Sequence, residues 1–154
     1  MSTEAEISNM VEEWHQHADW AQNCHYAAGL FYERLFLFLG IPVIVLSAIT
    51  GGTEILGDFN KYILGVTSLC IAVLAGLQTF LKFSQRAEQH RIAGSHYGGI
   101  RRSLEEAKIT LSESSAAAKA EVHEVKKQLD SLANECPEIP GHILRKHKVE
   151  NNKK

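Results

Sequence analysis

Two uncharged apolar runs dominate this chain and restrict what it can fold into. They cover residues 35–53 and 62–81 and lie between polar, helix-forming arms. Their nineteen and twenty residues, at about 1.5 Å per residue, give roughly 28 to 30 Å of helix, close to the thickness of the hydrocarbon layer of a bilayer. Each run is long enough to span a membrane, and together they predict a transmembrane hairpin.

The arms on either side of the hairpin carry opposite charge. Residues 1–34 contain six acids and one arginine, a net charge of -5, whereas residues 82–154 contain fourteen bases and ten acids, a net charge of +4. Opposite charge favours a meeting of the arms on one side of the membrane, although exposed ion pairs are individually weak. We therefore expect the N-terminal helix to pack on the stretch after Lys82.

Basic residues near the spans predict the orientation of the hairpin. The acidic N-terminus does not resemble a signal peptide. The two arms carry basic residues close to the spans, namely Arg34, Lys82, Arg86 and Arg91, whereas the short connector contains the single base Lys61. Because Lys and Arg concentrate on the cytoplasmic side, both termini are predicted to be cytoplasmic. This indicates a multi-pass membrane protein.

The fold predicted from these patterns is an all-α membrane protein, a two-helix transmembrane hairpin with long cytoplasmic helical extensions and a third cytoplasmic helix. Its expected segments are an N-terminal cytoplasmic amphipathic helix (1–34), a first transmembrane helix (35–53), a short external connector (54–61), a second transmembrane helix (62–81), a cytoplasmic helical region (82–136) and a basic tail (137–154).

Details of these segments follow from turn residues and periodicity. Gly51, Gly52, Gly57 and Asp58 punctuate the connector. The second span is expected to continue past Lys82, and a loop at residues 111–115 separates it from the third cytoplasmic helix, which ends before Pro137.

Three glycines at 94, 98 and 99 indicate either close packing or a break. The basic tail is expected to be loosely ordered and to touch anionic lipid.

Small and polar residues in the spans are the candidate functional residues. Small residues four apart let membrane helices approach closely, either within one chain or between copies, and polar residues would line a pore made by several copies. The helix-packing or pore-lining candidates are Ser47, Gly51, Gly65, Ser68, Ala72, Gly76 and Gln78. Gly40 and Pro42 predict a kink in the first span, either an ordinary bend or a hinge.

The sequence offers no catalytic, metal or cofactor site. Its eight histidines lack ligand spacing, and His25, His90 and His123 are expected to be interface histidines. The three widely spaced cysteines predict reduced thiols. The sequence contains no Ser-His-Asp order, no Walker loop and no dinucleotide-binding fingerprint. No charged residue lies within either span. We therefore expect neither an enzyme, a nucleic-acid partner nor a charge-coupled transporter.

Three segments resemble a known family. They are GIPVIVLSAITGG (40–52), LQTFLKFSQRAEQHRIAGSHYGGIRRSLE (77–105) and ECPEIP (135–140). They are similar to the SLATT domain, a two-transmembrane effector domain associated with SMODS nucleotidyltransferases and SLOG sensors. The resemblance implies a homo-oligomer that perforates the bacterial inner membrane in an antiviral or conflict system, after a separate nucleotide-sensing protein signals infection.

Two other functional classes compete with this interpretation. In one, the hairpin anchors cytoplasmic coiled helices that recruit another protein, as an accessory subunit without pore activity. In the other, the apolar runs form the core of a soluble helical bundle, which would require the remaining residues to cover two helices that are apolar all round. The exposure of the apolar runs in the folded chain discriminates the soluble bundle from the other two classes.

Overall fold

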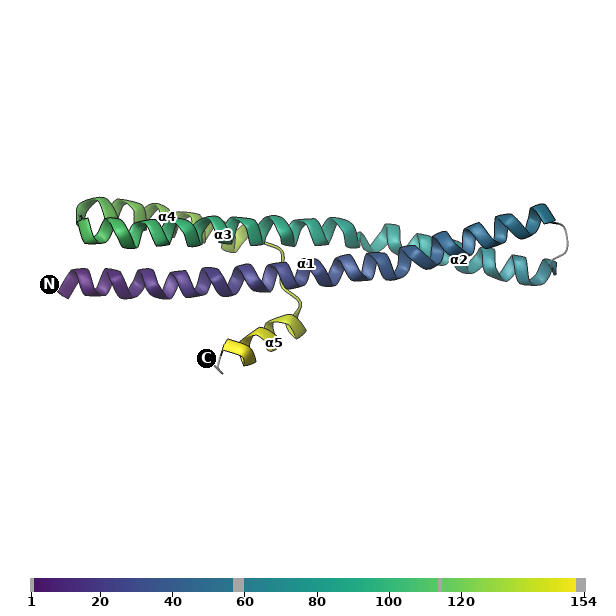
Figure 1. Ribbon diagram of the computed structural model, residues 1–154, viewed down its shortest axis with the longest axis horizontal. Coiled ribbons are helices and arrows are strands. Elements are labelled where there is room, and N and C mark those ends of the chain that lie inside the picture. The colour runs from purple at the N-terminus through teal and green to yellow at the C-terminus, as the bar shows by residue number, and fades with distance from the viewer. Residues whose placement is uncertain (1, 57–59, 114, 152–154) are drawn as a thin grey trace. The chain divides into compact units, whose positions relative to one another are not determined.

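The computed structural model describes residues 2–56, 60–113 and 115–151, and every element in these ranges is a helix (Figure 1). The five helices are α1 (Ser2–Leu56), α2 (Lys61–Leu81), α3 (Phe83–Glu113), α4 (Ser115–Glu135) and α5 (Gly141–Asn151). They form two compact units. The bundle unit comprises Met1–Gly29 with Glu88–Lys154, and the hairpin unit comprises Leu30–Ala87.

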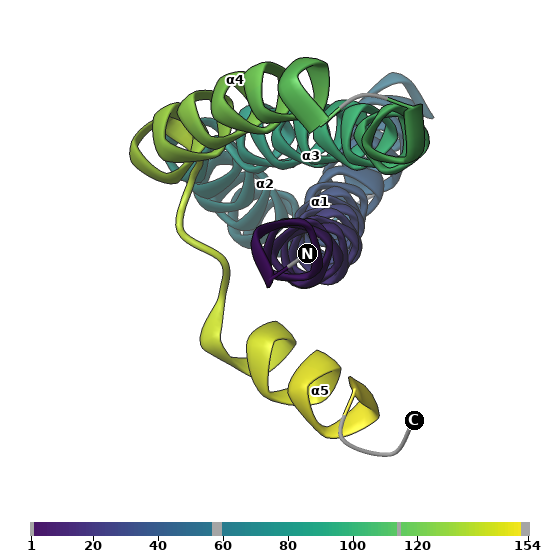
Figure 2. The same ribbon diagram turned by 90° about the vertical axis from the view of Figure 1, so that its left-hand side faces the viewer.

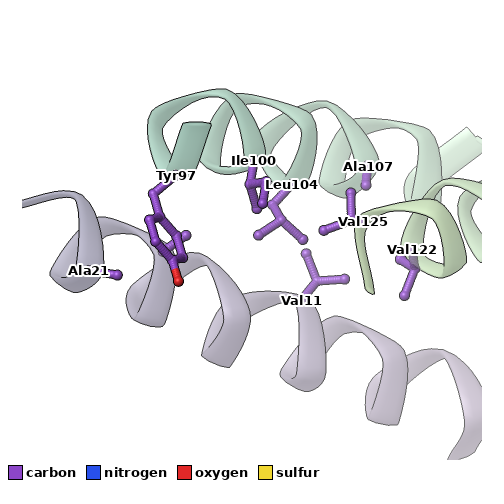
Figure 3. Packing of buried hydrophobic residues seen from close by; sticks show 9 residues of the cluster. Val11, Ala21, Tyr97, Ile100, Leu104, Ala107, Val122 and Val125 are labelled. Atoms are coloured by element: carbon purple, nitrogen blue, oxygen red, sulfur yellow. The ribbon is translucent and has the colours of Figure 1, made fainter. Parts of the chain in front are cut away.

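The bundle unit buries one apolar cluster between α1, α3 and α4. Figure 2 shows these three helices packed along one another, and Figure 3 shows the cluster. Leu104 of α3, which is fully buried, is among its largest side chains. The cluster consists of Val11, Ala18, Ala21, Tyr97, Ile100, Leu104, Ala107, Val122 and Val125. Their three- and four-residue spacing within each helix is that of amphipathic helices that bury one face.

Ion pairs fix the register of α1 against α3. Asp19 pairs with Arg101 at 3.0 Å, and Glu12 pairs with Lys108, so two acids seven residues apart on α1 meet two bases seven residues apart on α3. The side chain of Lys108 holds the pKa of Glu12 below its ordinary value. The predicted packing of the N-terminal helix on the stretch after Lys82 is therefore confirmed within the bundle unit.

Two of the three glycines of α3 mark close approach to α1. A Cβ at Gly94 would lie 2.9 Å from the ring of Tyr26, and one at Gly98 would lie 2.6 Å from the side-chain nitrogen of Gln22, whereas one at Gly99 would meet nothing within 4 Å. Helix α3 continues through all three positions. Of the two alternatives that the sequence left open, close packing is the observed one at Gly94 and Gly98, and no break occurs.

The second apolar helix does not continue into the bundle as expected. Helix α2 ends at Leu81, and Lys82 adopts the left-handed conformation, with φ 50° and ψ 41°. Helix α3 starts immediately afterwards, because the N–H of Arg86 donates to the carbonyl of Lys82 at 3.0 Å. Left-handed geometry favours glycine, so a lysine at this position gave no sequence signal of the break.

Other boundaries also differ from the expectation. Gly51 and Gly52 lie inside α1, which extends to Leu56, so they do not belong to the connector, and Gly57 and Asp58 fall outside the described residues. Asn60 caps α2, since its side-chain oxygen accepts the N–H of Tyr62 at 3.0 Å. The expected loop at residues 111–115 is wrong for residues 111–113, which belong to α3, and for Ser115, which starts α4.

The expectation of a loosely ordered tail is wrong for most of its length. Helix α5 covers Gly141–Asn151, and the carbonyl of Pro140 accepts the N–H groups of Ile143 and Leu144 at 2.9 and 3.3 Å. Ile143 is buried. The proline ahead of the first turn and the buried Ile143 both favour this helix in a segment that is otherwise basic.

Candidate functional site: the exposed apolar hairpin

The hairpin unit is apolar and exposed at the same time. Two helical stretches in the described part of the chain are long and apolar enough to cross a membrane, and no residue of either apolar window is buried. The exposed fraction of the residue is 76% at Phe38, 70% at Ile44, 66% at Leu69 and 83% at Phe80. Soluble proteins rarely expose so large an apolar surface. This exposure argues against the reading of the two runs as a soluble core.

One face of each helix is partly covered by the other helix of the hairpin. The half-buried residues recur at three- and four-residue spacing, which is the pattern of a helix-to-helix contact. On α1 they are Leu35, Phe36, Leu39, Gly40, Val43, Leu46, Thr50 and Thr53, and on α2 they are Leu64, Thr67, Ile71, Leu74, Ala75, Gln78 and Leu81. Outside this contact, the remaining surface of both helices is not covered by the other helix of the hairpin.

Gln78 belongs to this internal contact. Its amide nitrogen donates to the carbonyl of Phe36 at 3.5 Å, and the same nitrogen would lie 2.8 Å from a Cβ added at Gly40. Gly40, predicted as part of a kink, therefore provides the space that Gln78 occupies. Helix α1 continues without a break through Pro42, and the predicted bend there stays a prediction.

The small-residue stripe of α2 lies outside the internal contact. Gly65, Ser68, Ala72 and Gly76 are all exposed, and a Cβ added at either glycine would meet nothing within 4 Å. We call these four residues the small stripe. The sequence left open whether this stripe packs the two spans of one chain. In the structure a different face makes that contact, and the small stripe stays open.

Ser47 and Gly51, the small pair of α1, are exposed as well. The hydroxyl of Ser47 donates to the carbonyl of Val43 at 2.7 Å, and on α2 the hydroxyl of Thr79 donates to the carbonyl of Ala75 at 2.9 Å. Hydroxyls that bond the carbonyl of the preceding turn carry no unmet donor. These helices can therefore expose such residues to hydrocarbon at little cost.

The basic residues expected near the spans are exposed and free to contact solvent or headgroups. Arg34, Lys82, Arg86 and Arg91 are all exposed. Within the hairpin unit the guanidinium of Arg86 lies 5.9 Å from the centre of the Tyr32 ring, and Tyr32 stacks on Phe83 at 6.2 Å. Aromatic rings beside cations are typical of the level of lipid headgroups.

A buried histidine pair in the bundle unit is a titratable cluster that the sequence did not bring together. His25 and His90 are 3% and 2% exposed, and their Nδ1 atoms lie 3.0 Å apart. Tyr97 stacks on His25 at 5.5 Å. The two histidines are 65 residues apart in sequence, so no spacing rule pairs them. Both were expected at an interface, which is confirmed, whereas His123 is exposed.

The chemistry of this pair is set by burial. Burial, followed by the charge of the neighbouring His90, lowers the pKa of His25 to about 4, and burial lowers the pKa of His90. Both rings are therefore neutral at pH 7, and the Nδ1–H of one donates to the Nδ1 of the other. No group of three or more His, Cys, Asp or Glu within the described residues could hold a metal ion.

No protein-family model, curated protein or solved structure matches the chain.

Proposed function

We propose that the chain is an oligomeric membrane effector that forms a pore in the inner membrane or disrupts it. The observation that carries this proposal is an apolar hairpin whose outer surface is exposed, with its small stripe unused by the chain itself. Lipid covers an apolar surface that the protein leaves bare, and a second helix backbone fits against small residues. Two helices alone enclose no water path, so several copies are required.

The resemblance to SLATT domains supports a bacterial antiviral or conflict system as the setting. In this proposal both termini lie in the cytoplasm, where the exposed bases Arg34, Lys82, Arg86 and Arg91 meet the headgroups. In cells, a separate nucleotide-sensing protein would raise pore formation above the level that the chain reaches by itself. The bundle unit, with its own buried cluster, is the part of the chain that such a protein would contact.

Dye release from liposomes tests the proposal. The purified chain, reconstituted into vesicles loaded with carboxyfluorescein, should release the dye with or without added nucleotides, whereas protein-free vesicles retain it. Flotation of the vesicles and proteolysis of the exposed bundle would verify insertion in the same samples. Inserted protein that retains dye under every condition would contradict pore formation.

A membrane-anchored interaction module is the second candidate. It is favoured by the bundle unit, which has an apolar cluster and ion pairs independent of the hairpin. In that case the hairpin serves only as an anchor, so substitutions in the small stripe leave partner binding intact. Retained dye together with retained partner binding would select this candidate.

A further inference from the structure

A groove on the bundle unit runs between α1 and α4 and has charges of opposite sign on its two sides. Its volume is about 330 Å³, and its floor is apolar. It is lined by Ile7, Met10, Trp14, Lys119, Val122, His123 and Lys126. Lys119 and Lys126 thus stand on the α4 side. Glu6 and Glu13, each one residue before a lining residue of α1, are exposed beside it.

These charges repeat at the same interval on both helices. Glu6 and Glu13 are seven residues apart, as are Lys119 and Lys126, so each pair spans two helical turns, about 10.5 Å along its helix. Helix α1 carries a second pair of acids at the same interval, Glu12 and Asp19, which already bind Lys108 and Arg101 of α3. The ion pairs found among the described residues do not use Glu6, Glu13, Lys119 or Lys126.

Helices α1 and α4 also lie along the same stretch of the bundle and run in the same direction. Ile7 and Trp14, which follow the two acids in sequence, line the same groove as Lys119 and Lys126, so both acids and both lysines lie along the same stretch of the bundle. Helices α1 and α4 run in the same direction, both opposite to α3 (Figure 1). Rotating a second copy about an axis parallel to the bundle leaves each charged residue at the same position along that axis. In two copies related in this way, Glu6 faces Lys119 of the other copy, and Glu13 faces Lys126 of the other copy.

We propose that this groove is the surface by which the bundle units of two copies of the chain associate side by side in parallel. The parallel direction rests on the proposed membrane function, because copies whose α1 helices enter one bilayer from the same side must run the same way. Grooves that face each other bury Met10 and Trp14 between the copies, and the four charge pairs enclose them. An apolar centre with a charged rim is the usual anatomy of a protein interface.

Disulfide formation between two differently substituted chains tests this contact. One full-length chain carries Glu13→Cys, the other carries Lys126→Cys, and both carry Cys70→Ser to remove the exposed native thiol. In mild detergent the mixed chains should form the 13–126 disulfide at least about tenfold faster than Glu13→Cys mixed with Glu124→Cys, since a thiol bridge requires close Cβ atoms. Glu124 is exposed on α4 and does not line the groove.

Charge reversal at the neighbouring pair makes the test specific for the register. Lys119→Glu in the second chain places like charges opposite Glu6 of the first chain and should slow disulfide formation severalfold. Glu6→Lys in the first chain should then restore the rate. Absence of the 13–126 disulfide, a rate equal to that of the Glu124→Cys control, or no rescue would each overturn the proposal. These outcomes are read without dye release, so they are independent of whether the hairpin forms a pore.

Discussion

Replacing Ala72 and Gly76 with leucine should lower dye release from vesicles at least about tenfold while the chain stays inserted. Both residues belong to the exposed small stripe of α2, where no other part of the described chain packs. Two leucines would hold the backbones of neighbouring copies apart and remove the close contacts on which helix association in lipid depends. Release rates of the variant and of the unaltered chain at equal protein-to-lipid ratio are the measurement.

Val66→Leu with Val73→Leu is the matched control for this prediction. Both valines are exposed on α2 but lie outside the small stripe and outside the half-buried face. The control also adds side-chain volume to the same helix, and it should leak like the unaltered chain. Equal leakage by the small-stripe variant and the control would contradict assembly through the small stripe. Loss in both would indicate that α2 tolerates no added bulk anywhere.

Acidification should destabilise the bundle unit between about pH 6.5 and pH 4. The pKa of His25 is about 4 in the folded chain and about 6.5 when the chain is unfolded. The unfolded state therefore binds more protons in this range, and stability falls as the pH falls. Above pH 6.5 both states are neutral and the effect vanishes. The difference corresponds to a loss of about 3 kcal/mol from His25, and the lowered pKa of His90 acts in the same direction.

Urea unfolding followed by tryptophan fluorescence measures this loss. The only two tryptophans of the sequence, Trp14 and Trp20, both lie in the bundle unit. In His25→Asn, the amide keeps a polar partner for His90 but does not titrate, so the free energy of unfolding should change much less with pH. His17→Asn, at an exposed position, is the control and should keep the full dependence. A free energy of unfolding that is unchanged from pH 7 to pH 4.5 would contradict a neutral buried pair.

The hairpin was predictable from the sequence because it depends on local composition. An uncharged run of about twenty residues specifies a helix long enough to span a bilayer without reference to the rest of the chain. The all-helical fold and the two apolar helices are accordingly confirmed. The contact of the N-terminal arm with α3 was also accessible, because opposite net charge on two arms is visible in the sequence.

The features that the sequence did not reveal depend on three-dimensional placement. The break at Lys82 lacks the glycine that usually marks a left-handed residue. The pairing of His25 with His90 joins two helices across 65 residues. The face on which the small stripe lies is defined only once Gln78 and its neighbours are known to meet α1. The groove beside Trp14 likewise requires the position of α4.

We expect lipid, rather than water or protein, to surround the outer face of the hairpin. A nitroxide attached to Cys70, which is exposed near the middle of α2, tests it by power-saturation electron paramagnetic resonance in lipid vesicles. A nitroxide surrounded by lipid should show high accessibility to oxygen and low accessibility to a water-soluble nickel complex, with the reverse for a nitroxide at Lys61→Cys. High accessibility to nickel at Cys70 would show that water surrounds this face, and low accessibility to both reagents would show that protein covers it; either result would contradict a lipid-facing hairpin.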